Sequence, residues 1–181
     1  PLELSDGRIA DKVVANIPYN ITGPLLERLV GRLDRPVDPP YQRLVLLVQQ
    51  EVARRISARP GQSSFSALSV RMQLLADCSS VCPVPPRCFQ PPPKVQSEVI
   101  SIDPKTADQR PPQAVAKQLE RLLRLAFGAR RKMVRNTLAS AAPAVGLEAW
   151  LGEAGITPQQ RPQEIAPQQW VALAAALQPA L

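Results

Sequence analysis

The sequence predicts an α/β protein: a sheet of parallel strands with an antiparallel edge, followed by a small all-α domain. Three observations predict this class. Continuous apolar runs at 12–15 and 43–48 flank a stretch in which leucines have helical spacing, the order strand, helix, strand that forms a βαβ unit. Residues 95–102 alternate between apolar and polar, which is typical of a half-exposed strand. From residue 113 onward the apolar spacing is helical.

The predicted βαβ unit begins with KVVA at 12–15, which we expect to be a buried strand that meets a loop at a polar residue and a proline. Thr22 is predicted to cap the following helix, with Pro24 in its first turn. Apolar residues then recur at helical spacing, at Leu25, Leu26, Leu29, Val30 and Leu33. The proline-rich segment 34–40 ends this helix. RLVLLV at 43–48 has the composition of a strand buried on both faces of a parallel sheet.

The middle of the chain is predicted to add two helices and an antiparallel strand pair. Helices are expected at 51–57 and 64–76, with a turn at Pro60-Gly61 between them. A candidate strand at 78–84 is followed by a proline-rich connection and by the alternating run at 95–102. Two strands joined in this way indicate an antiparallel edge to the sheet.

The C-terminal part is predicted to be all helical and to form its own domain. Its helices are expected at 113–127, 132–141, 146–154 and 167–178. A polar, proline-containing stretch follows Pro104, so we place a domain boundary near residue 108, which gives domains 1–108 and 109–181. Doubly wound sheets usually carry a Gly-rich turn that holds a nucleotide-like ligand. The printed sequence has no G-x-G-x-x-G, so we expect that half of the fold to be missing.

The composition narrows the classes of function. A net charge of +7 and a pI near 9.9 favour a polyanionic partner, nucleic acid before membrane, and no apolar run is long enough to span a bilayer. Cys78, Cys82 and Cys88 offer too few ligands for zinc in a chain without histidine, so we expect no metal site and free thiols in the reducing cytoplasm. Having no histidine also excludes Ser-His-Asp and Cys-His catalysis.

The sharpest chemical signal is Asn16-Ile17-Pro18-Tyr19, at the end of the first strand. An ordinary strand-end turn has a similar composition, but the tetrapeptide also matches the N-[IL]-P-Y form with which amino-group methyltransferases hold an adenine. The adenine N6 amine is a poor nucleophile because its lone pair is delocalised into the ring. The Asn16 side-chain oxygen and the Ile17 carbonyl can each accept one amine N–H, which frees that lone pair for attack on a sulfonium methyl group. Pro18 stiffens the loop, and stacking on Tyr19 is typically worth about 1–3 kcal/mol.

A second aromatic residue, Phe89, precedes a rigid proline run at 91–93. A proline-rich turn with one buried aromatic side chain is the alternative interpretation. Placed opposite Tyr19, the Phe89 ring would complete a sandwich around a flipped-out base, as enzymes that work on a base amine require. We therefore predict that Phe89 is the second stacking residue.

Basic residues concentrate after Phe127 and Gly128. Four cations lie within six residues at the start of a predicted helix: Arg130, Arg131, Lys132 and Arg135. A solvated, charge-rich helix terminus is the alternative, but cations at a helix N-terminus oppose the helix dipole, and a phosphate backbone crossing there would offset that cost. A weaker basic cluster is interpreted as the exposed face of an amphipathic helix, formed by Arg54, Arg55 and Arg59.

In their order and intervals, these motifs resemble those of the small-subunit ribosomal RNA adenine N6,N6-dimethyltransferases. The resemblance covers almost the whole chain, through KVVANIPYNIT, QQEVARRISARPG, FSALSV, VPPRCFQPPPKVQS, FGARRKMVRNTL and RPQEI. It implies the C-terminal half of a Rossmann-like class I methyltransferase sheet and a C-terminal helical domain that binds rRNA. It also implies a monomer that transfers methyl groups from S-adenosyl-L-methionine to two adjacent adenines near the 3′ end of 16S rRNA, during ribosome biogenesis.

The resemblance also implies a role for each residue of the motifs. Asn16 would contact both the target amine and the methionine end of the donor, and Ile17 and Pro18 would complete the acceptor loop. Tyr19 and Phe89 would stack the adenine. The cations that would hold rRNA, or the immature small subunit, are Arg130, Arg131, Lys132 and Arg135.

The family's Gly-rich donor loop and two acidic residues, one for the donor ribose and one beside the adenine, lie upstream of the position that Asn16 occupies. This chain has no counterpart of them and opens on Pro1, so we expect an N-terminally truncated sequence that is inactive alone. Two alternatives stay open. One is a large-subunit rRNA adenine dimethyltransferase of the antibiotic-resistance type, against which FGARRKMVRN and the helical tail argue. The other is a non-catalytic RNA-binding assembly factor of the same fold, against which the intact NIPY motif argues.

Overall fold

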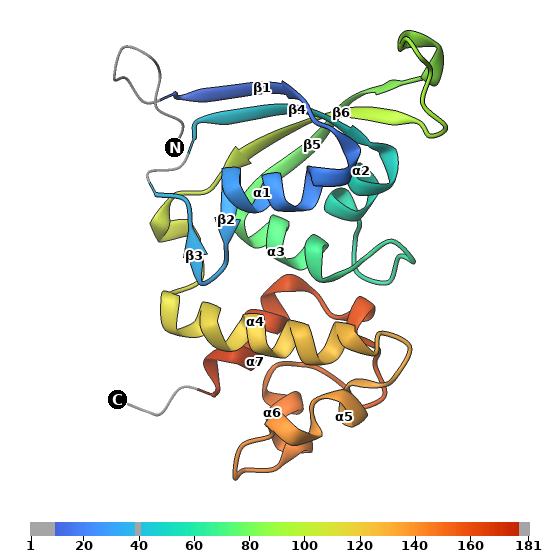
Figure 1. The fold of residues 1–181 in the computed structure, drawn as a ribbon. Coiled ribbons are helices and arrows are strands. Elements are labelled where there is room, and N and C mark those ends of the chain that lie inside the picture. The colour runs from blue at the N-terminus through green and yellow to red at the C-terminus, as the bar shows by residue number, and fades with distance from the viewer. Residues whose placement is uncertain (1–9, 39–40, 178–181) are drawn as a thin grey trace.

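The computed structural model describes residues 10–38 and 41–177, and a four-stranded sheet forms its upper layer (Figure 1). Across the sheet its strands are β1 (Lys12–Asn16), β4 (Arg43–Gln49), β6 (Ser97–Pro104) and β5 (Ala76–Val84). β1 and β4 are parallel, whereas β6 runs antiparallel to both β4 and β5. The predicted α/β class, the βαβ unit and the antiparallel edge pair are therefore confirmed.

The helices form two layers on one side of the sheet (Figure 1). The layer next to the sheet holds α1 (Thr22–Val30), α2 (Gln50–Ser57) and α3 (Ala67–Leu75). The outer layer holds α4 (Gln113–Gly128), α5 (Val134–Thr137), α6 (Leu147–Glu153) and α7 (Pro167–Ala175). A small antiparallel pair follows α1, made of β2 (Gly31–Arg32) and β3 (Arg35–Pro36). Within residues 10–38 and 41–177, no helix combines the length and apolarity that a bilayer crossing needs.

Short 3-10 helices connect these elements. They are η1 (Tyr19–Ile21), η2 (Pro86–Cys88), η3 (Ala107–Gln109), η4 (Ala139–Ala141) and η5 (Pro162–Glu164). η1 lies between β1 and α1, and η2 lies on the loop between β5 and β6. The predicted stacking residue Tyr19 is the first residue of η1, and the other, Phe89, directly follows η2.

One apolar core joins the sheet to both helical layers. On β4 the alternate residues Leu44 and Leu46 are fully buried, opposite Ile102 and Ile100 of β6. The outer layer contributes two fully buried indole rings to the same cluster, those of Trp150 and Trp170. Because the core is continuous, the domain boundary placed near residue 108 stays a prediction.

The other face of the sheet is not buried, contrary to the prediction for both apolar runs. Val14 of β1 is 81% exposed, and its neighbour on that face, Val45 of β4, is only half-buried. β1 lies at the sheet edge, and in the described part of the chain no helix covers this face (Figure 1). An apolar run predicts which residues favour burial, but the elements packed around a strand determine whether burial occurs.

The start of α1 also differs from the prediction. Ile21 occupies the N-cap position, and Thr22 is the first residue of the helix. The Thr22 hydroxyl donates a 3.2 Å hydrogen bond to the Tyr19 carbonyl. At the other end, Gly31 stops the helix with a φ of 92°, and a Cβ there would lie 2.5 Å from the Pro36 Cα. The predicted helix end at 34–40 is thus several residues late, and residues 39–40 lie outside the described ranges.

The three cysteines are free thiols in different environments: Cys78 and Cys82 lie on β5, and Cys88 lies on the loop that follows it. Burial, assisted by the negative charge of Asp77, raises the pKa of the Cys78 thiol to about 12, whereas Cys82 and Cys88 are exposed. Because the thiolate is the reactive form, iodoacetamide at pH 8 should modify Cys82 and Cys88 readily and Cys78 only after unfolding. Mass spectrometry of the alkylated peptides measures the three rates, and equal rates in the folded protein would contradict the expectation.

Candidate functional site

The predicted strand-end motif lies where β1 leaves the sheet. The Ile17 N–H donates to the Leu47 carbonyl at 3.1 Å, which extends the pairing with β4 by one residue, and the Ile17 side chain is buried. Pro18, with a φ of −57°, then leads into η1, which is closed by a 3.1 Å bond from the Ile21 N–H to the Pro18 carbonyl. Asn16 is exposed at the end of the strand. The core therefore fixes the motif's backbone and leaves the asparagine at the surface.

Two hydrogen-bond acceptors of this motif have no partner in the described part of the chain, and they differ in exposure: Asn16 is exposed, whereas Ile17 as a whole residue is 1% exposed. Within the described residues, no hydrogen bond uses the side-chain amide of Asn16 or the carbonyl of Ile17. The two oxygens belong to consecutive residues, and the fixed backbone of Ile17 limits their relative movement. Two acceptors on consecutive residues match in number the two N–H bonds of a single amino group.

Tyr19 is held by Ser97, a residue that the sequence analysis did not single out. The Tyr19 hydroxyl and the Ser97 Oγ are 2.5 Å apart and form a hydrogen bond. Ser97 is fully buried and pairs with Gln49, so β6 begins at the edge where β1 and β4 end. The next bond along this edge runs from the Gln50 N–H to the Gln96 carbonyl at 2.9 Å. The signal in the sequence that could have identified Ser97 is its position, as a small polar residue at the start of an alternating strand.

Phe89 lies on the loop between β5 and β6, directly after η2, and it is half-buried. This loop projects beyond the body of the sheet (Figure 1). Among the described residues, the ring contacts include no pair of Phe89 with Tyr19; the pair found is Phe127 with Trp170, whose centroids are 6.0 Å apart. The same loop ends at the serine that holds Tyr19. The sandwich of Tyr19 and Phe89 around a base stays a prediction.

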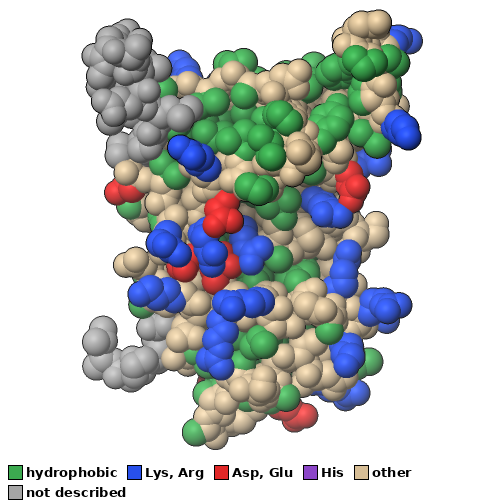
Figure 2. Space-filling view, viewed as in Figure 1, with side chains coloured by type: hydrophobic (Ala, Val, Ile, Leu, Met, Phe, Trp, Pro, Cys, Tyr) green, Lys and Arg blue, Asp and Glu red, His purple; other side chains and the backbone are tan. Residues whose placement is uncertain are grey.

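Three cations of the basic cluster, at positions 130–132, lie in the turn between α4 and α5, and Arg135 lies within α5, so the cluster is not the start of a helix over 132–141. α4 ends at Gly128, and α5 spans only Val134–Thr137. Arg130, Arg131 and Lys132 therefore follow the C-terminus of a 16-residue helix, where positive charge is favourable, so the predicted dipole cost is wrong for these three. Three of them are exposed and form no ion pair within the described residues: Arg131, Lys132 and Arg135. Figure 2 shows many Lys and Arg side chains on the helical half of the visible face.

The fourth cation, Arg130, has an intramolecular role that the sequence did not predict. Its Nη2 donates to the carbonyls of Ser63 and Phe65, at 2.7 and 3.3 Å. Phe65 is fully buried, so the loop between α2 and α3 is itself anchored to the core. Arg130 thereby attaches the basic turn to this loop. Because both partners are neutral carbonyls, they do not compensate its positive charge.

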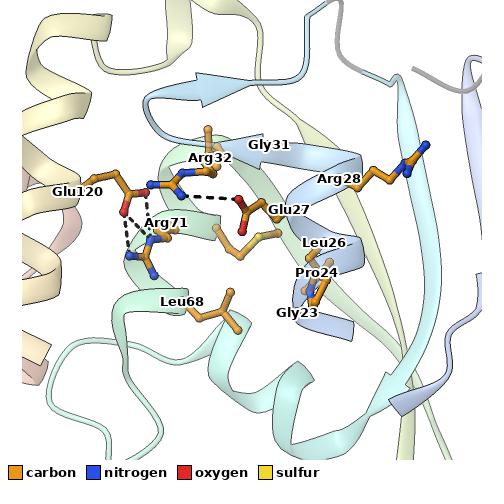
Figure 3. Close-up of a pocket in the computed structure, with 12 residues that line it drawn as sticks. Gly23, Pro24, Leu26, Glu27, Arg28, Gly31, Arg32, Leu68, Arg71 and Glu120 are labelled. Carbon is orange, nitrogen blue, oxygen red and sulfur yellow. Dashed lines mark hydrogen bonds and ion pairs between the residues drawn. The ribbon is translucent and has the colours of Figure 1, made fainter. Parts of the chain in front are cut away.

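A cavity of about 830 Å³ lies elsewhere, between α1, α3 and α4 (Figure 3). Four of its five charged groups are already paired: Arg71 donates to both Glu120 oxygens at 2.8–3.0 Å, and Arg32 lies 3.7 Å from Glu27. The fifth, Arg28, is exposed. The two acceptors of the NIPY motif that have no partner among the described residues are at the end of β1 instead. We therefore place the candidate site at the sheet edge, beside Asn16.

An α/β fold with an NIPY segment at a strand end is a methyltransferase-like architecture, and residues 8–178 match the family model described as ribosomal RNA adenine dimethylase. The chain belongs to this family. It is 88% identical over 180 residues to ribosomal RNA small subunit methyltransferase A of Synechococcus sp. (strain RCC307), covering 99% of this chain and 66% of that relative. It is 73% identical over 177 residues to the protein of the same name from Parasynechococcus marenigrum (strain WH8102), covering 98% of this chain and 59% of that relative. The chain therefore spans two thirds or less of these relatives' length.

Two solved structures have a similar fold. A dimethyladenosine transferase from Plasmodium falciparum matches with a TM-score of 0.70 and 24% identity, over 90% of this chain and 65% of that one. The 23S rRNA methyltransferase ErmE matches with a TM-score of 0.66 and 25% identity, over 92% of this chain and 64% of that one. These likenesses confirm the predicted fold class.

Proposed function

We propose that this chain carries the target-adenine and RNA-binding part of an rRNA adenine N6,N6-dimethyltransferase that acts on two adjacent adenines near the 3′ end of 16S rRNA. The observation that carries the proposal is the pair of acceptors on Asn16 and Ile17 that have no partner among the described residues, held at the end of β1 beside an anchored Tyr19. The relatives from Synechococcus sp. (strain RCC307) and Parasynechococcus marenigrum are both named small subunit methyltransferases, which supports the small subunit as the substrate. The proposed setting is the cytoplasm, with a monomeric protein on the immature subunit.

The chain's residues act on the target base before any methyl group moves. Asn16 and Ile17 each accept one N–H of the N6 amine, so its lone pair is drawn out of conjugation with the ring. The hydrogen bond to Ser97 fixes the Tyr19 hydroxyl, so the ring is ordered before a base stacks on it. This contribution is one of orientation and fixed dipoles, which needs no histidine.

The Asn16 side chain also fits the proposed methyl donor, S-adenosyl-L-methionine, which supplies an electrophilic methyl group when bound. An asparagine amide has one acceptor oxygen and an NH2 group with two donors. The exposed Asn16 amide has no hydrogen bond within the described residues, so both ends are available. Its oxygen can hold the target amine while its NH2 group holds the carboxylate at the donor's methionine end.

The exposed cations of the turn after α4 and of α5 are proposed to hold rRNA by its phosphates. Arg131, Lys132 and Arg135 have no competing carboxylate partner within the described residues, so contact with RNA breaks no ion pair. Arg130 supports this surface through the carbonyls of the α2–α3 loop, and its charge adds to the field. Phosphate contacts of this kind give affinity and register without reading sequence.

Methyl transfer to purified ribosomal subunits tests the proposed function. The assay uses a fused protein in which the donor-binding N-terminal part of the Synechococcus sp. (strain RCC307) relative precedes residues 1–181. We expect labelled methyl groups in small-subunit rRNA and, after nuclease digestion, N6,N6-dimethyladenosine at two neighbouring positions. ErmE has a similar fold, so large subunits are assayed in parallel. Methylation of large-subunit rRNA alone would contradict the proposal.

A further inference from the structure

A cavity of about 600 Å³ opens at the sheet edge, and the proposed function does not use it. Its walls come from the end of β4 and the start of α2, the α2–α3 loop, the segment before β6 and the turn after α4. Six of the lining residues matter here: Gln49, Gln50, Arg54, Ser64, Gln96 and Arg130. The volume lies in the range of about 300–1,000 Å³ that ligand pockets occupy.

The cavity adjoins the proposed adenine site. Asn16 is in register with Leu47, and Gln49 lies two residues further along β4. With neighbouring strands about 4.8 Å apart and a rise of about 3.3 Å per residue, Asn16 and Gln49 are separated by roughly 8 Å. Gln96, on the cavity wall, directly precedes the Ser97 that holds Tyr19. A single nucleotide step spans such a separation.

The cavity is positively charged. Three arginines and one glutamate line it, but Arg55 and Glu51 form an ion pair with each other. Arg130 donates to two neutral carbonyls, so its charge is not compensated. The Arg54 guanidinium forms no hydrogen bond or ion pair within the described residues and is exposed. Arg54 and Arg130 therefore leave two positive charges for an anion.

The remaining lining groups can recognise a nucleoside. The side chains of Gln49, Gln50 and Gln96 offer amide donors and acceptors, and Ser64 adds a hydroxyl. Single-stranded RNA is read by such hydrogen bonds to base edges and the 2′-hydroxyl, together with contacts to its phosphates. No aromatic residue is among the lining residues, so recognition here depends on hydrogen bonding and charge, not on stacking.

We propose that this cavity binds the nucleotide next to the target adenine, with its phosphate on Arg54 and Arg130 and its base or ribose on the glutamine amides. This inference rests on the proposed function, because it requires an RNA whose target base lies at Asn16. It assigns a role to the cluster of Arg54, Arg55 and Arg59, of which only Arg54 is left unpaired inside the cavity. Arg59 lies outside it and lines a different hollow.

Binding of short RNAs to residues 1–181 tests the proposal. The probes are a single-stranded RNA with two adjacent adenines and versions of it with one uncharged methylphosphonate linkage on either side of the target adenine. Arg54→Gln should weaken binding of the unmodified RNA about tenfold, the size of one charge-assisted contact. When the methylphosphonate replaces the phosphate that lies on Arg54, the affinity of the wild type should fall by the same factor. The affinity of Arg54→Gln should then fall almost no further.

Two matched variants separate this effect from a general loss of charge. Arg59→Gln removes an arginine from the same segment outside the cavity and should bind every probe as the wild type does. Arg131→Gln should weaken binding of all probes by one common factor. If Arg54→Gln loses the same factor with every probe, the proposal is wrong even where the fused protein methylates small subunits. If Arg54→Gln is insensitive to the methylphosphonate at one position only, but the fused protein methylates neither subunit, the cavity binds RNA and the proposed function is wrong. Thermal melts check that each variant is folded.

Discussion

Replacing Asn16 with alanine should reduce methyl transfer by about 10²–10³-fold in kcat while RNA binding changes little. Alanine removes one of two acceptors for the N6 amine, so the amine keeps its planar, delocalised form when the base is bound. The carbonyl of Ile17 and the stacking face of Tyr19 remain, so most of the binding free energy is preserved. The measurement is incorporation of labelled methyl into small subunits by the fused protein, with the rRNA affinity determined separately.

Asn20→Ala is the matched control for this variant. Asn20 is also an exposed asparagine, but it lies within η1, one turn beyond the strand end. We expect normal methylation from Asn20→Ala and a normal KM for the subunit in both variants. Normal methylation by Asn16→Ala would show that the assigned chemistry is wrong, and it would favour an assembly factor of the same fold.

Replacing Arg71 with alanine should lower the free energy of unfolding by about 3 kcal/mol. Arg71 on α3 forms a bidentate ion pair with Glu120 on α4, so it joins the two helical layers (Figure 3). The Glu120 side chain is only 6% exposed, so without Arg71 its carboxylate is left buried without the hydrogen bonds that Arg71 donates. For a chain of this size, such a loss lowers Tm by about 6–12 °C. Urea denaturation followed by circular dichroism measures it.

The opposite replacement should cost much less, because the two partners differ in exposure. The Arg71 side chain is 33% exposed, so after Glu120→Gln water can still solvate the guanidinium, and the glutamine keeps an acceptor. We expect a loss of about 1 kcal/mol. Arg43→Ala, which removes the exposed partner of Asp103, serves as a control and should shift the midpoint very little. Equal losses for Arg71→Ala and Glu120→Gln would contradict this account of the pair.

Local patterns were sufficient to predict the elements of the sheet but not their surroundings. The runs at 12–15 and 43–48 form the parallel pair, and the alternating run near 95–102 forms the antiparallel strand, because side-chain periodicity follows directly from backbone geometry. Burial of Val14 was predicted wrongly, since burial depends on what packs against a strand. The helix over 132–141 was also wrong: only Val134–Thr137 is α-helical, because its last residues form η4.

The candidate site was predicted where its residues are consecutive and missed where they are distant in sequence. Asn16 to Tyr19 form one short segment, so a strand-end position could be inferred from the pattern alone. Ser97 meets Tyr19 across 78 residues, and Arg130 meets Ser63 across 67. Contacts of that kind depend on strand order and on how helices pack, which no local spacing encodes. For the same reason, Arg130 was predicted only as an RNA ligand.

The hydrogen bonds between Arg130 and the α2–α3 loop would affect which nucleotides of a bound rRNA reach the site at Asn16. The loop is anchored by the buried ring of Phe65, so the turn with the exposed cations is held at a set place relative to the β4 terminus. An rRNA bound at that turn would place at Asn16 only nucleotides that lie at a fixed distance from the bound segment. The protein would then select its target adenines by their distance from the bound segment of RNA. It would not need to recognise the bases in between.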